Sequence, residues 1–127
     1  MTKHLVVSNS NLLIRVTSGQ VAYITSDGSY STMVLTDGRQ HVFSFNLSTF
    51  ERLLETQLGT ESQIFIRLGK SLIINSSYIY CINVSKQELV LSGFDLREEI
   101  SLSASREALK ALKSVIEEST KSRRIGI

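Results

Sequence analysis

The segment that decides the fold reads Phe65-Ile66-Arg67-Leu68-Gly69-Lys70-Ser71-Leu72-Ile73-Ile74-Asn75. It begins inside an apolar run, Ile64 to Leu68, that predicts a β-strand. The break at Gly69 predicts that residues 69–75 connect this strand to the next one. Phe65, Ile66, Ile73 and Ile74 are predicted core residues, and Asn75 is predicted to be structural, satisfying backbone groups where the chain turns. The polar side chains that remain are Arg67, Lys70 and Ser71.

On the N-terminal side of this segment, short apolar or alternating runs predict four strands, at residues 12–16, 21–25, 31–36 and 41–45. Asp27-Gly28 and Asp37-Gly38 are turn dipeptides, which favour an antiparallel meander. A short helix is predicted next, because Leu47, Phe50, Leu53, Leu54 and Leu58 recur at helical spacing. Ser48 and Glu51 stand three residues apart, as in a capping box.

On the C-terminal side, strands are predicted at residues 78–84, 88–91 and 96–102. A longer helix is predicted over residues 106–118, with Ser103 or Ser105 as its N-cap and an apolar stripe at Leu109, Leu112, Val115 and Ile116. Residues 120–127 are polar and basic and are predicted to be a frayed tail. The predicted fold is therefore mainly β, with small antiparallel sheets, one short central helix and a C-terminal helix.

Length and composition are typical of one ordinary globular domain: 127 residues, of which 42% are hydrophobic. The apolar runs are too short for a membrane helix or a signal-peptide core, so we expect no membrane insertion and a cytoplasmic location. Cys81 is the only cysteine and lies in an apolar run, which favours a buried, inert thiol. The net charge of +2 does not indicate nucleic-acid binding, because Lys121, Arg123 and Arg124 at the C-terminus account for it.

The sequence contains little that could support catalysis. His4, His41 and Cys81 do not have metal-ligand spacing, so no metal site is predicted. The glycines form neither a dinucleotide-binding motif nor a P-loop, and no serine lies in a nucleophile elbow, which leaves a hydrolase as a remote alternative. Glu98 and Glu99 are neighbours on a predicted strand and should point to opposite faces. We predict no enzyme activity and no cofactor.

Three features together resemble the LytTR DNA-binding domain, a family of bacterial response-regulator output domains. The first is residues 21–30, Val-Ala-Tyr-Ile-Thr-Ser-Asp-Gly-Ser-Tyr, followed by Asp37-Gly38 and the helix with its Leu53-Leu54 pair. The second is the opening segment, ending at Tyr78-Ile79, and the third is Ser105-Arg106 at the start of the last helix. The resemblance covers about residues 12–118. It departs at Gly69, where many members carry histidine.

The resemblance implies a transcription regulator that binds DNA through loops in successive major grooves, without a recognition helix. Tyr30, Lys70 and Arg106 match the positions at which the family's three loops deliver side chains. Arginine and lysine donate to guanine edges or phosphate, and tyrosine offers a hydroxyl or its ring. Considered singly, the three could instead be a sheet-edge tyrosine, a turn lysine and a solvated arginine.

Two further motif residues have divided interpretations. Arg67 is assigned either to an ion pair inside the fold, which is favoured, or to a phosphate contact. The Ser71 hydroxyl could bind phosphate or cap the turn.

The predicted organisation is a short N-terminal extension at residues 1–11, the DNA-binding domain at 12–119 and a basic tail at 120–127. The resemblance implies double-stranded DNA with paired repeat sites as the partner, and a monomer or weak dimer in solution. Only about 20 residues precede the first motif, so we expect no receiver domain and a regulatory partner protein or ligand instead. The competing interpretation is a small β-rich protein-interaction module without DNA binding.

Overall fold

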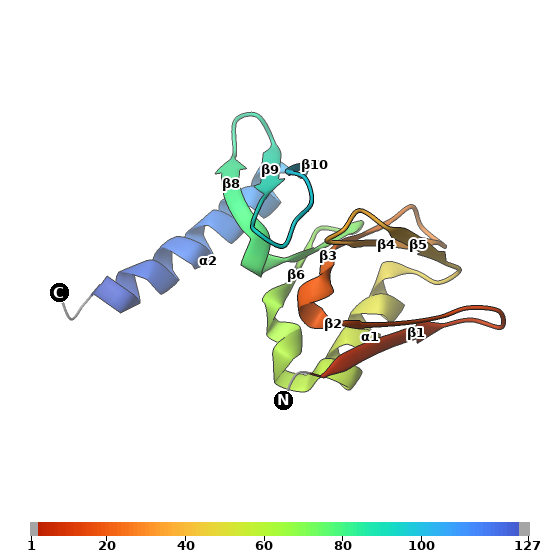
Figure 1. The fold of residues 1–127 in the computed structure, drawn as a ribbon. Helices are drawn as coiled ribbons and strands as arrows, with labels where there is room; N and C mark the ends of the chain where they lie inside the picture. The colour runs from red at the N-terminus through yellow and green to blue at the C-terminus, as the bar shows by residue number, and fades with distance from the viewer. Residues whose placement is uncertain (1–2, 125–127) are drawn as a thin grey trace.

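The structure is a computed structural model that describes residues 3–124. Three antiparallel sheets and two α-helices make up the fold (Figure 1). The five-stranded central sheet has the order β5 (Gln40–Phe43), β4 (Ser31–Leu35), β3 (Val21–Ser26), β7 (Leu72–Asn75) and β6 (Phe65–Leu68). The N-terminal hairpin consists of β1 (His4–Ser8) and β2 (Leu13–Thr17), and the third sheet has the order β10 (Ile100–Ser103), β9 (Glu88–Leu91) and β8 (Ile79–Asn83).

Helices lie on both sides of the central sheet. The helix α1 (Leu47–Leu58) packs with the N-terminal hairpin on one face, and α2 (Arg106–Arg124) lies with the three-stranded sheet on the other (Figure 1). Short 3₁₀ turns connect the elements: η1 (Ser18–Gln20), η2 (Gly59–Ile64) and η3 (Ser76–Tyr78). These observations confirm the predicted mainly β fold with one central and one C-terminal helix.

The central sheet divides the interior into two cores because successive side chains of a strand point to opposite faces. Ile73 belongs to the core beneath α1, and its neighbours Leu72 and Ile74 belong to the core beneath α2. Phe65 packs toward α1, whereas Ile66 packs toward α2. Arg67, the next residue of β6, therefore returns to the α1 side, which decides what it can contact.

Asn75 ends β7 and is fully buried. Its Nδ2 donates to the backbone oxygens of Ser18 (3.3 Å) and Val21 (2.9 Å), and its Oδ1 accepts from the Ser77 amide (3.0 Å). The Tyr78 hydroxyl donates to the Gly19 backbone oxygen beside it. Asn75 thus ties the start of β3 to the end of β7, which confirms the predicted structural role.

Three strand predictions require correction. Residues 72–75 are not part of a connection but form β7, the partner of both β3 and β6. Residues 96–99 precede β10 as a loop, so Glu98 and Glu99 are not on a strand. Residues 4–8, placed in an extension, form β1, whose Leu5 and Val7 are buried in the core beneath α1.

Cys81 is exposed, so the prediction of a buried thiol was wrong. The cause is an irregularity in β8, where Ile79 pairs with Leu91 but Cys81 pairs with the adjacent Val90. This bulge disrupts the alternation of the strand, and both Tyr80 and Cys81 face solvent.

Helix α2 is longer than predicted. It continues past Glu118 to Arg124, so residues 120–124 are helical and not a frayed tail, while residues 125–127 lie outside the described part. No glycine or proline interrupts this stretch, and Lys and Arg favour helix. Leu109 and Leu112 are buried against the body, but Val115 (62%) and Ile116 (37%) are exposed. No helix among residues 3–124 is both long and apolar enough to cross a bilayer.

Candidate functional site

Two turns and a loop that are far apart in the sequence meet at one end of the central sheet. They are the β3–β4 turn, the loop between β5 and α1, and the β6–β7 turn. Together they line a hollow of about 380 Å³, formed by Ser26, Asp27, Gly28, Asn46, Leu47, Ser48, Arg67, Lys70 and Ser71. The Ser26 amide donates to the Ser71 backbone oxygen at 2.9 Å, which fixes the β3–β4 turn against the β6–β7 turn. The fold therefore brings the loop of the first motif beside the loop of the second.

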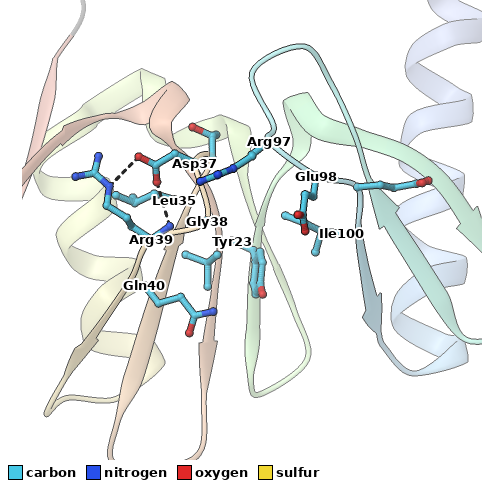
Figure 2. A pocket seen from close by; sticks show the side chains of 12 residues that line it. Tyr23, Leu35, Asp37, Gly38, Arg39, Gln40, Arg97, Glu98 and Ile100 are labelled. Carbon is cyan, nitrogen blue, oxygen red and sulfur yellow. Dashed lines mark hydrogen bonds and ion pairs between the residues drawn. The ribbon is translucent and has the colours of Figure 1, made fainter.

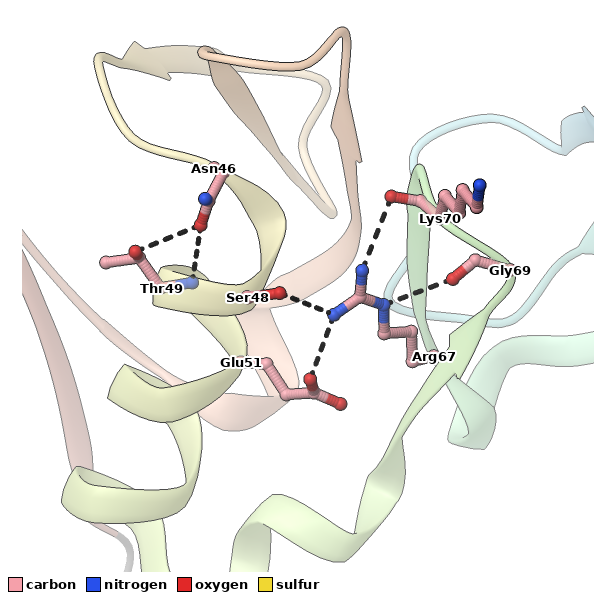
Figure 3. Close-up of polar contacts among 7 residues, drawn as sticks. All are labelled: Asn46, Ser48, Thr49, Glu51, Arg67, Gly69 and Lys70. Atoms are coloured by element: carbon pink, nitrogen blue, oxygen red, sulfur yellow. Dashed lines mark hydrogen bonds and ion pairs between the residues drawn. The ribbon is translucent and has the colours of Figure 1, made fainter.

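Arg67 holds the β6–β7 turn against α1 (Figure 3). Its Nε donates to the Gly69 backbone oxygen at 3.1 Å, and Nη2 contacts the Lys70 backbone oxygen at 3.5 Å. Its Nη1 donates to Ser48 Oγ and to Glu51 Oε1, both at 3.1 Å. The guanidinium is thus engaged by two elements at once, in the ion pair that was the favoured prediction.

Ser48 and Glu51 do not form the predicted capping box of α1. The N-cap is Asn46, whose Oδ1 accepts from the Thr49 amide at 2.9 Å (Figure 3). Because α1 begins two residues earlier than a cap at Ser48 requires, Ser48 and Glu51 fall within the first turns and face Arg67. Sequence reasoning missed both residues as parts of the site. They lie 19 and 16 residues from Arg67 in the sequence, and no local pattern pairs them with it.

Lys70 lies in the β6–β7 turn, between Gly69 and Ser71, which both shape the backbone of the turn. Gly69 has a positive φ of 68°, a conformation that side chains with a Cβ rarely adopt. Ser71 uses its backbone oxygen to hold the neighbouring turn. Both Lys70 and Ser71 are exposed, and neither side chain makes a hydrogen bond or ion pair among residues 3–124. Lys70 is therefore presented to solvent by a turn whose backbone is fixed.

Tyr30 ends the β3–β4 turn and is 52% exposed. Its backbone oxygen accepts from the Asp27 amide at 3.2 Å, which closes the turn, and Gly28 has a positive φ of 103°. Ser26 adds contacts between its hydroxyl and the Gly28 backbone. The tyrosine side chain is thus about half exposed at the end of a closed turn.

Arg106 is the first residue of α2 and is exposed. The Ser105 hydroxyl accepts from the Ala108 amide at 3.2 Å, so Ser105 caps this helix, one of the two predicted candidates. Ala108 and Leu112 line an apolar hollow together with Leu68 and Gly69. The first half of α2 consequently lies against β6 and Gly69, on the face of the central sheet opposite α1.

The electrostatics of the molecule do not indicate a catalytic centre. Burial raises the pKa of Tyr23 and of Tyr78, and hydrogen bonds from Arg39 lower the pKa of Asp37 on the surface. In the part of the chain that the structure describes, no three acidic, histidine or cysteine side chains group to hold a metal ion. What the candidate site offers is a set of exposed hydrogen-bond donors.

Comparisons with known proteins were made for the whole chain. A family model described as the LytTr DNA-binding domain matches residues 11–117. The search of curated proteins gives no match. Among solved structures, the chain is similar to the LytTr DNA-binding domain of a Bacillus cereus methyl-accepting/DNA response regulator. That match has a TM-score of 0.61 and 18% identity, and it covers 91% of this chain and 98% of that chain. At this identity the likeness concerns the fold alone.

Proposed function

The chain belongs to the LytTR family of DNA-binding domains, and from this premise we propose that it is a sequence-specific transcription regulator that contacts successive major grooves through its loops. The family is one of DNA binding in transcription regulation and is not catalytic, in agreement with the prediction of a non-enzyme. We place the DNA-binding unit at residues 12–119, with the strand β1 at residues 4–8 completing its core. The specific contacts proposed below come from this chain's own geometry.

The observation that carries the proposal is the exposure of Tyr30, Lys70 and Arg106 on turns and a helix start whose backbones are fixed. Lys70 and Arg106 are donors suited to guanine O6 and N7 or to phosphate oxygens. Tyr30 provides a hydroxyl for phosphate or a ring for a thymine methyl. Because each comes from a different loop, the three side chains suit a surface that follows a groove.

Arg67 and Ser71 take supporting roles in this proposal. The Arg67 guanidinium already binds α1 and the turn, so it positions Lys70 and reaches DNA only by giving up those partners. The Ser71 hydroxyl lies at the rim of the same hollow and is proposed to donate to a phosphate.

The partner is double-stranded DNA, with paired repeats as the proposed site. Two copies would then bind along one face of the duplex, with weak or no association in its absence. A regulatory partner protein is a further part of the proposal. Sedimentation without DNA tests the expected weak association of the free protein, and a stable dimer at micromolar concentration would contradict it.

The test begins with selection of bound sequences from a random duplex pool at moderate salt. We expect an enriched repeat whose affinity falls steeply when the selected site is titrated at rising salt, because binding releases counterions from phosphates. Intact folding with no enrichment would overturn the proposal.

Single substitutions then separate the roles of the loops. Arg106→Ala should cost about 1–3 kcal/mol and relax preference at one base position if the contact is to a base edge. Lys70→Ala should weaken all sequences alike and reduce the salt slope by about one if the contact is to phosphate. Arg15→Ala is the matched control, since Arg15 is an exposed cation on β2, outside these loops. Equal effects of all three variants would refute the site assignment.

The alternative function is a β-rich protein-interaction module, favoured by the fully exposed ring of Phe94 and the 71% exposed Tyr80. A largely apolar contact responds little to salt, whereas phosphate binding responds strongly. The same salt titration therefore distinguishes the two functions.

A further inference from the structure

A second hollow, of about 470 Å³, lies at the opposite end of the central sheet from the turns that carry Tyr30 and Lys70. One wall is the β4–β5 turn at residues 36–39 with Gln40 of β5, and the other is the loop that precedes β10. The Arg97 amide donates to the Thr36 backbone oxygen at 3.0 Å and ties the two walls together. Figure 2 shows the ring of Tyr23 between the walls, with Ile100 across from it.

The side chains of this hollow carry opposite charges that are not used by the fold. Arg97 points across the hollow toward the β4–β5 turn, whereas Glu98 points along the other wall toward Ile100 (Figure 2). Among residues 3–124, neither side chain makes an ion pair or a hydrogen bond. By contrast, Asp37 and Arg39 neutralise each other at 2.7 Å. A free cation and a free carboxylate thus flank an apolar patch of Tyr23, Val34 and Ile100.

We propose that this hollow binds a small zwitterion, a free amino acid or dipeptide with an apolar side chain. Its carboxylate would accept from the Arg97 guanidinium, its ammonium would donate to Glu98, and its apolar side chain would lie on Tyr23 and Ile100. The volume falls in the range of small-molecule sites, which pair apolar walls with a few polar groups. Charge-assisted hydrogen bonds at both ends would fix the orientation of the ligand.

Ligands of a single charge fit the hollow less well. A nucleotide or phosphate would meet the carboxylates of Glu98 and Glu99, which line the same wall. A simple cation would meet Arg97. Burial raises the pKa of Tyr23, so its hydroxyl is neutral at pH 7 and adds no charge to the balance. Only a ligand that carries both signs satisfies both walls.

The test measures binding of L-leucine and of leucyl-leucine to the full chain by calorimetry, without DNA. Each probe is compared with its amide, which lacks the carboxylate, and with its N-acetyl form, which lacks the ammonium. We expect at least one probe to bind, and both modified forms of it to bind about ten-fold more weakly. Arg97→Gln should remove the preference for the free carboxylate, and Glu98→Gln the preference for the free ammonium. Arg15→Gln should change neither.

Failure of both probes to bind at millimolar concentration would overturn the proposal. Binding that Arg97→Gln and Glu98→Gln leave unchanged would overturn it as well. Because the inference goes beyond DNA binding and is measured without DNA, its failure leaves the proposed function intact.

Discussion

At the scale of single residues, Arg67 shows how one side chain can serve a binding surface without belonging to it. Its three nitrogens contact four acceptors, two on the turn that carries Lys70 and two on α1. The planar fork of arginine suits this arrangement, and lysine offers only one ammonium at a point. The exposure of Lys70 on a defined turn depends on this link.

Arg67→Ala should therefore lower the free energy of unfolding by about 1–2 kcal/mol, less than a buried charged network, because the Arg67 side chain is 28% exposed. DNA affinity should fall with the salt slope unchanged, and Arg67→Lys should not restore it. Chemical denaturation and salt titration measure both effects. A slope reduced by about one would instead make Arg67 a phosphate contact.

Asn75 offers a cleaner case because it is fully buried and all its contacts are with backbone. Asn75→Ala removes the side-chain donor to the Ser18 and Val21 oxygens and the acceptor of the Ser77 amide, so we expect a loss of about 2–3 kcal/mol in unfolding free energy. Denaturant unfolding measures it, with Ser77→Ala as the control. A loss below about 0.5 kcal/mol would mean that water replaces the side chain.

The sequence predicts residue roles best where chemistry leaves few options. An asparagine between apolar strands must satisfy its amide, and its role was predicted correctly. The role of Arg67 stayed divided, because the prediction depends on whether an acceptor lies across from it. Its partners Ser48 and Glu51 are 19 and 16 residues away in the sequence, and only the packing of α1 on the sheet brings them together.

At the scale of elements, the observed N-cap of α1 differs from the one that the sequence pattern predicts. The pattern of Ser48 and Glu51 fits a capping box, yet Asn46 accepts from the Thr49 amide and Ser48 binds Arg67. Asn46→Ala should cost about 1 kcal/mol of stability through loss of the cap. Ser48→Ala should cost less, and its effect should vanish in an Arg67→Ala background. Thermal or urea unfolding of the double-mutant cycle tests this assignment.

The bulge in β8 yields a chemical prediction. Because the register shift exposes Cys81 together with Tyr80, the native protein should react with a thiol reagent at a rate close to that of a free cysteine. Native and urea-unfolded samples should differ by less than about ten-fold in labelling rate. Protection by orders of magnitude would show that the strand buries the thiol, as the apolar run suggests.

Some strands were predicted from the sequence more accurately than others. The strands β3 and β4 were located correctly, because their apolar and β-branched runs are bounded by turn residues. Residues 72–75 are all buried, since β7 lies inside a sheet covered on both faces, and such a run does not alternate. The bulge depends on the register of β8 with β9, and the burial of β1 depends on its packing beneath α1, neither of which the local pattern specifies.

At the scale of the whole molecule, the central sheet is a layer between two cores, and the N-terminal hairpin completes one of them. Leu5 is fully buried and Val7 nearly so, beneath α1. Gln57 of α1 fixes the hairpin further, because its side chain accepts from the Val6 amide at 2.7 Å and donates to the Val6 oxygen at 2.9 Å. The first residues therefore belong to the folded unit, although the family match begins at residue 11.

Leu5→Ala is the measurement that decides whether this hairpin is part of the cooperative fold. If it is, the substitution opens a cavity in the core beneath α1 and should lower the unfolding free energy by about 2–5 kcal/mol. DNA affinity measured below the unfolding transition should stay within a few-fold, since the loops that carry Lys70 and Arg106 lie on other elements. Leu13→Ala is the control on the same hairpin, because Leu13 is 62% exposed and should change stability by less than about 0.5 kcal/mol. Equal, small effects of both variants would show that the hairpin frays independently and that the core forms without it.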